Sequence, residues 1–182
     1  MSALPLNTGL FFEDFQTGQK FKSAGRTVTE HDIATFAGLS GDFNQIHTDA
    51  EFAKSTPFGQ RIAHGLLGLA IASGLAVQTG ILGANVIAFR EVGEWKFVKP
   101  VFIGDTIHVD MEVMETKAFP RLGGGLVTLN VYVNNQSNET AMKGLWTVLV
   151  KTRGSSRAET GITSSHAETG ITSSRAETGT TS

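Results

Sequence analysis

Apolar and polar residues alternate through the second half of the chain, a pattern typical of strands with one buried face. The segment 106–114 is the clearest, because apolar residues from Ile107 to Val113 take every second position. Successive side chains of a strand point to opposite faces, so this spacing predicts a half-buried strand. Turn-forming residues separate the similar segments, and we expect strands over residues 86–97, 106–114, 126–134 and 141–151.

Residues 65–78 are apolar on nearly every side of a helix, which predicts a long helix buried within the protein. Weak alternation over residues 20–28 predicts a further strand. Thr29 with Asp32 resembles a capping box and predicts a short helix over residues 30–37. One buried helix and a largely antiparallel sheet that wraps around it make an α+β fold.

The C-terminal residues 154–182 contain three nine-residue repeats rich in serine, threonine and glycine. These repeats have almost no apolar surface to bury, so packing would not offset the conformational entropy lost on ordering them. We therefore expect one folded domain over residues 1–153, followed by a disordered low-complexity tail over residues 154–182.

Composition narrows the class of protein. The formal net charge is -2 at pH 7 and no basic run is present, so we expect no binding to nucleic acid. The chain has no cysteine, which excludes disulfides, thiolate metal ligands and a cysteine nucleophile. No secretory signal is recognisable, and no apolar segment reaches the ~20 residues of a membrane span. We expect a cytoplasmic protein that does not enter the membrane.

The candidate chemistry lies in the segment that precedes the long helix. Asp42 and His47 are five residues apart, and Gly65 then begins the helix. A carboxylate and an imidazole that hold one water can activate it and transfer its proton. The N–H of Gly65 would point out of the first helical turn and stabilise an oxyanion. The pattern indicates addition or removal of water next to a carbonyl, with Asp42 and His47 as the catalytic pair.

Two further residues are candidates for substrate binding. Asn44 either contacts substrate or hydrogen-bonds the backbone of its own loop. The loop role is favoured, because asparagine side chains commonly bond nearby backbone groups. Ser73 either lines an acyl pocket or packs within the long helix. We expect His64 to be structural. No pair of histidines has the spacing of metal ligands, so we expect no metal site.

The chain resembles the MaoC-like dehydratase family, and within it the (R)-specific enoyl-CoA hydratases. The resemblance covers roughly residues 10–151 and is carried by Gly41-Asp42-Phe43-Asn44-Gln45-Ile46-His47, Phe58-Gly59-Gln60-Arg61-Ile62-Ala63-His64-Gly65 and Lys99-Pro100-Val101-Phe102-Ile103-Gly104-Asp105-Thr106. It implies a hotdog fold, in which an antiparallel sheet wraps a long central helix, for the whole domain 1–153.

The resemblance also assigns roles to residues. It implies that Asp42 and His47 bind the water, that Gly65 binds the thioester oxygen, and that Ser73 matches a small polar residue found on the helix of some members. The family usually carries proline at the position of Gln45, so this chain departs from the pattern there.

The activity that the resemblance implies is reversible hydration of a trans-2-enoyl thioester to the (R)-3-hydroxyacyl thioester. The substrate would be carried by coenzyme A or an acyl carrier protein, and no other cofactor is expected. At least a homodimer is implied, in which sheets join edge to edge. Two alternatives stay open, a hotdog acyl-CoA thioesterase and a non-catalytic module that binds acyl thioesters.

Overall fold

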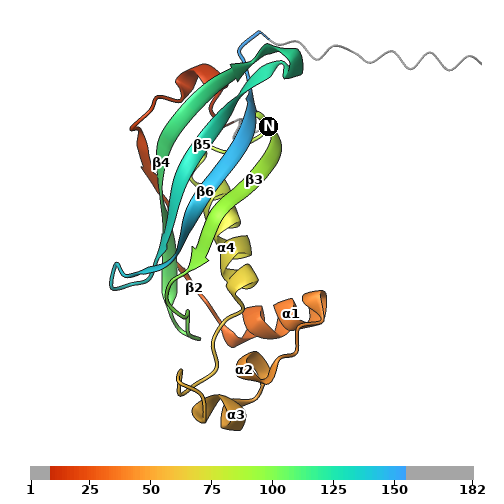
Figure 1. Ribbon diagram of the computed structural model, residues 1–182, viewed down its shortest axis with the longest axis vertical. Helices are drawn as coiled ribbons and strands as arrows, with labels where there is room; N and C mark the ends of the chain where they lie inside the picture. Colours follow the sequence, from red (N-terminus) through yellow and green to blue (C-terminus); the bar gives the residue numbers. More distant parts are fainter. Residues whose placement is uncertain (1–8, 155–182) are drawn as a thin grey trace, which may run out of the picture.

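The computed structural model of the protein describes residues 9–154. The predicted tail lies outside the described residues, apart from Gly154, and its disorder stays a prediction. A curved antiparallel sheet packs against one long helix, and three shorter helices gather beyond one end of the sheet (Figure 1). The predicted α+β fold is confirmed.

The sheet has the strand order β1-β4-β5-β6-β3, and β2 also pairs with β4. The central strands β4, β5 and β6 pair antiparallel, and so does the edge strand β3 with β6. The predicted strands in the second half are therefore confirmed, with β4 longer than expected. The six strands are β1 (Lys20–Lys22), β2 (Arg26–Thr27), β3 (Val86–Phe97), β4 (Thr106–Phe119), β5 (Gly124–Asn134) and β6 (Thr140–Lys151).

The single strand predicted over residues 20–28 is instead divided into β1 and β2. Between them, the Ser23 hydroxyl accepts the N–H of Val109 at 2.8 Å. A side chain thus takes the place of a backbone carbonyl in the ladder, and the regular pairing stops there.

The long helix α4 (Gly65–Gln78) has the predicted bounds. Leu67, Ile71 and Leu75 are buried with the inward side chains of β4 and β5 in one core. The opposite side is uncovered in the single chain, where Leu66 is 62% exposed and Val77 is 52% exposed. The prediction of a helix buried on all sides is therefore wrong for the single chain, because the sheet covers one side only.

The three short helices are α1 (Glu30–Ser40), α2 (Gln45–Thr48) and α3 (Ala50–Lys54). The Thr29 hydroxyl accepts the N–H of Asp32, and the Asp32 carboxylate accepts the N–H of Thr29. Burial opposes the charged form of Asp32, but the hydrogen bonds from Thr29 and the nearby charge of Arg26 outweigh it and lower the pKa of Asp32.

Helix α1 runs past its predicted end at residue 37 and stops at Gly41, whose φ of 77° lies in the left-handed region. This ending delivers Asp42 directly after the last turn of α1. Within residues 9–154, no helix combines the length and hydrophobicity that a membrane span requires.

Gly124 and Gly125 both lie in β5, directly after the turn that joins it to β4. A Cβ atom on Gly124 would meet the Val150 carbonyl oxygen at 2.2 Å, and one on Gly125 would meet the Phe12 ring at 2.3 Å. Only glycine allows these close approaches. The turn itself is made by a 3-10 helix, Pro120–Leu122, followed by Gly123.

Candidate active site

The loop between α1 and α2 is shaped by its own polar side chains. The Asp42 carboxylate accepts the N–H of Asn44 at 3.2 Å, and the Asn44 amide oxygen accepts the N–H of Ile46 at 3.1 Å. The Asn44 carbonyl accepts the N–H of His47 at 2.9 Å. Asn44 is thus the N-cap of α2 and the link between Asp42 and His47, which favours the loop role over contact with substrate.

His47 is half-buried and its ring is held by one backbone group. Its Nδ1 lies 2.8 Å from the Ile62 carbonyl oxygen. A carbonyl oxygen can only accept, so Nδ1 carries the proton in this hydrogen bond. The neutral ring then presents the lone pair of Nε2 to the site, which is the form that a general base requires.

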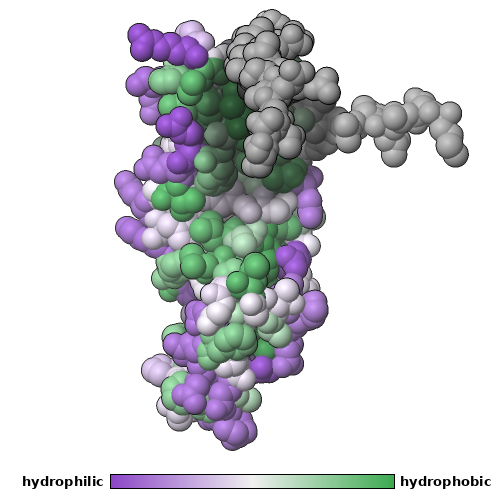
Figure 2. Space-filling view, turned by 90° about the vertical axis from the view of Figure 1, so that its right-hand side faces the viewer, coloured by the Kyte–Doolittle hydropathy of each residue, from purple (hydrophilic) through white to green (hydrophobic). Residues whose placement is uncertain are grey.

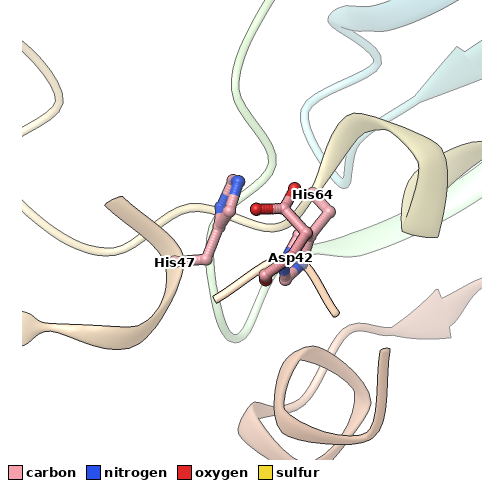
Figure 3. Close-up of side chains that lie close together, drawn as sticks. All are labelled: Asp42, His47 and His64. Carbon is pink, nitrogen blue, oxygen red and sulfur yellow. The ribbon is translucent and has the colours of Figure 1, made fainter. Parts of the chain in front are cut away.

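Three side chains meet at this point. The nitrogen and oxygen atoms that Asp42, His47 and His64 offer all lie within 4.8 Å of one another. Figure 3 shows the Asp42 carboxylate turned toward the His47 ring. The structure therefore brings the two predicted catalytic residues together, and it adds His64, for which a structural role was expected.

His64 lies at the N-cap of α4 and is 3% exposed. Its Nε2 donates a hydrogen bond to the Asp42 carbonyl oxygen at 2.9 Å. Its ring lies against the His47 ring, with centroids 3.8 Å apart and planes 31° apart. The sequence does contain one indication of this position, since His64 directly precedes Gly65. A residue next to the first residue of the helix must lie near any group that the helix N-terminus faces.

A cavity of about 450 Å³ opens beside His47. Its lining is largely apolar, which suits an acyl chain. Lys99 also lines the cavity. Its ammonium group donates a hydrogen bond to the Glu139 carboxylate, and this bond and the positive charge hold the pKa of Glu139 below its usual range. The lining residues are His47, Phe58, Ile62, Ala63, His64, Gly65, Leu66, Phe97, Val98, Lys99, Pro100, Val101 and Met142.

Gly65 contributes the first N–H of α4 to this lining. The first N–H groups of a helix have no partner within it. Within residues 9–154, the N–H of Gly65 makes no hydrogen bond to another part of the protein. It is therefore free to donate to a ligand oxygen in the cavity, with the positive end of the helix dipole behind it.

Ser73 lies away from this group. It is exposed on α4, and its hydroxyl donates to the Ala70 carbonyl at 2.8 Å. Eight residues separate it from Gly65, which is about 12 Å along a helix. The structure does not bring Ser73 to the cavity beside His47, and its role in an acyl pocket stays a prediction.

The grouping of two histidines and a carboxylate changes the argument about metals. Sequence spacing indicates no metal site, yet the fold brings His47 and His64 together. The two imidazoles lie against each other, with centroids 3.8 Å apart and planes tilted by 31°. The Nδ1 of His47 faces the Ile62 carbonyl and the Nε2 of His64 faces the Asp42 carbonyl, so each ring has one nitrogen left for an ion. A zinc ion needs two nitrogens at 2.0–2.1 Å with converging lone pairs.

Comparisons with known proteins agree on one family. The model of the MaoC-like domain matches residues 14–135. An (R)-specific enoyl-CoA hydratase of Rhodospirillum rubrum is 34% identical over 149 residues, which are 79% of this chain and 94% of that protein. Protein MaoC of Klebsiella aerogenes is 40% identical over 99 residues, and this stretch is 54% of this chain but 29% of that protein.

Solved structures agree with the sequence comparisons. A protein of Archaeoglobus fulgidus described as a monoamine oxidase regulatory protein has a TM-score of 0.73 and 44% identity, covering 79% of this chain and 95% of its own. The (R)-hydratase of A. caviae has a TM-score of 0.65 and 30% identity, covering 77% and 98%.

A Mycobacterium tuberculosis protein with a double hotdog fold, 19% identical with a TM-score of 0.72, covers 82% of this chain and 46% of its own and supports the fold alone. The sheet around α4 is therefore a hotdog fold, as predicted. With the family model over most of the domain, the chain belongs to the MaoC-like dehydratase family.

Proposed function

We propose that the protein is a hydro-lyase that reversibly hydrates a trans-2-enoyl thioester to the (R)-3-hydroxyacyl thioester. The observation that carries this proposal is that Asp42 lies beside His47, and that His47 and the free N–H of Gly65 line one cavity. Relatives named as (R)-specific enoyl-CoA hydratases support the substrate class and the stereochemistry.

The chemistry follows from what each group can accept or donate. The Asp42 carboxylate and the His47 Nε2 each accept one O–H of the same water, which leaves an oxygen lone pair free to attack C3. As the C3–O bond forms, the double-bond electrons move through C2 to the thioester oxygen. The N–H of Gly65 would stabilise that enolate oxygen.

Protonation of C2 completes the addition. The pair takes a proton from the water as its oxygen adds to C3, and the same pair returns a proton to C2. The hydroxyl on C3 and the hydrogen on C2 together account for one water, so no redox partner or metal is needed. The reverse order of steps dehydrates the 3-hydroxyacyl thioester.

The direct test is loss of the enoyl-thioester absorbance when the purified protein is added to crotonyl-CoA. We expect loss with wild type, and a fall in kcat of ~10² or more in Asp42→Asn and in His47→Ala, since each removes one group that binds the water. Both variants should unfold near the wild-type temperature, because Asp42 is exposed and His47 is half-buried.

Either of two results would reject this proposal and support another function. Release of free coenzyme A without a hydroxyacyl product would identify a thioesterase. Inactive wild type across a panel of chain lengths and of coenzyme A and carrier-protein substrates, with binding retained, would identify a non-catalytic acyl-binding module.

A further inference from the structure

We propose that His64 is a positioning residue that holds Asp42 and His47 in register with the N–H of Gly65, an inference that rests on the proposed function. The His64 imidazole is not available to exchange protons with a substrate. It is nine-tenths buried, its Nε2 is occupied by the Asp42 carbonyl, and its ring is covered by His47.

The loop that carries Asp42 has few other attachments. Asp42, Phe43 and Asn44 are exposed, and the hydrogen bonds within residues 41–44 reach no further than five positions along the chain. Among the described residues, the bond from His64 to the Asp42 carbonyl is the one hydrogen bond that ties this segment to a distant part of the chain. Without it, the carboxylate would follow the motions of an exposed loop.

The same ring also sets the position of His47. The His47 imidazole is held at its edge by the Ile62 carbonyl and on its face by His64. Phe36 of α1 packs against His64 with ring centroids 5.1 Å apart. One side chain therefore joins α1, the Asp42 loop and α2 to the first turn of α4, where Gly65 follows directly.

Packing alone does not account for a histidine here. His64 Nδ1 is buried and has no hydrogen-bond partner among the described residues. A leucine would fill similar space without burying an unpaired nitrogen. The donor at Nε2 is thus the property that distinguishes this residue from an ordinary core side chain.

The test compares two amides of different length. The glutamine amide nitrogen can take the place of Nε2, whereas the asparagine amide nitrogen takes the place of Nδ1 and falls short of the Asp42 carbonyl. We expect His64→Asn to lower kcat on crotonyl-CoA by roughly 10- to 100-fold, because small displacements of reacting groups carry such costs. His64→Gln should recover most of this loss, and KM should change less than about threefold in both variants.

A structural role alone would give a different result. Val113→Ala serves as the control, since Val113 is buried in β4 away from the site and its truncation lowers stability. If His64→Asn loses no more kcat than this destabilised control, or if His64→Gln is no better than His64→Asn, the proposal is overturned.

A second readout does not depend on turnover. Long-range proton–nitrogen NMR should find the proton of His47 on Nδ1 and that of His64 on Nε2 in the wild type. Both variants remove the ring that lies against His47, so the signals that separate them are the backbone amides of residues 42–44. These signals should shift in His64→Asn and should stay near their wild-type positions in His64→Gln. Unchanged signals of residues 42–44 in His64→Asn would overturn the proposal even if the protein hydrates no enoyl thioester, an outcome that would reject the proposed function separately.

Discussion

At the scale of single residues, Gly65 has no room for a side chain. A Cβ atom at this position would lie 2.6–3.0 Å from three ring atoms of Phe97, the last residue of β3. Contacts this short force a neighbour to move. Phe97 lines the same cavity as the Gly65 N–H, so a methyl group here would disturb the place where a thioester oxygen is expected.

We therefore expect Gly65→Ala to lower kcat by roughly 10- to 100-fold, as a misplaced oxyanion donor would. Phe97→Ala should relieve the contact, so the double variant should recover much of the loss while Phe97→Ala alone keeps most activity. Steady-state kinetics on crotonyl-CoA provide the measurement. Full activity in Gly65→Ala would show that the close contact has no part in the site.

The residues of the site differ in how far the sequence could predict them. Asp42, His47 and Gly65 could be found because their chemistry and their local spacing lie in one segment that opens a helix. The role of His64 could not, because it depends on a ring contact between two segments that only the tertiary structure brings together. The exposed position of Ser73 depends on which side of α4 faces the sheet. The sequence does not show this, because α4 is apolar on nearly every side.

At the scale of elements, helix α2 shows why the chain can depart from its family at Gln45. Gln45 is the first residue of α2, and its N–H donates no hydrogen bond within the described part of the chain. Asn44 before it has φ -53° and ψ 133°, a conformation that a residue preceding proline adopts readily. Proline suits this position but is not required there.

Gln45→Pro should therefore raise the free energy of unfolding by about 0.4–1 kcal/mol, because it restricts the unfolded chain without removing a native hydrogen bond. Urea denaturation measures the change, and kcat should stay at the wild-type value. Ile46→Pro is the matched control. It removes the N–H that the Asn44 side chain accepts, so it should destabilise the protein. A loss of stability in Gln45→Pro would contradict the argument.

The bounds of elements were predictable where a single pattern dominates. Residues 65–78 and 86–97 match α4 and β3, since long apolar or alternating runs end at clear turn signals. The predicted strand over 20–28 failed because one serine hydroxyl replaces a backbone acceptor, an interaction with Val109 that no local pattern contains. Helix α1 passes Gly38 because its capping box and the Gly41 ending define it from both ends.

At the scale of the whole molecule, one face exposes more apolar surface than is usual for a protein that works as a single chain. The edge strand β3 exposes Ile87, Phe89 and Val92 by 40% or more, and α4 exposes Leu66 and Val77. Figure 2 looks onto the β3 side and shows hydrophobic side chains running down the middle of this face. Contiguous apolar surface and an open strand edge are both typical of an interface.

We propose that two copies join through the β3 edge, and we expect sedimentation of the wild type as a dimer. Val92→Lys should shift the protein toward monomer, because a charge on an edge strand opposes pairing. Met114→Lys is the matched control, an exposed apolar residue of β4 away from this edge, and it should leave the dimer intact. A monomeric wild type, or equal dissociation in both variants, would reject this interface.

The ends of the described chain also meet. Arg153 donates to the Asp14 carboxylate at 2.6 Å, and its backbone N–H donates to Glu13 at 3.1 Å. The end of β6, just before Arg153, lies at the end of the sheet opposite the short helices α1 to α3, which flank the Asp42 loop (Figure 1). A domain whose entry and exit adjoin, far from its working end, can be linked to other polypeptides or inserted between them with its chemistry intact. The fold is thereby suited to serve as a transferable module in larger proteins.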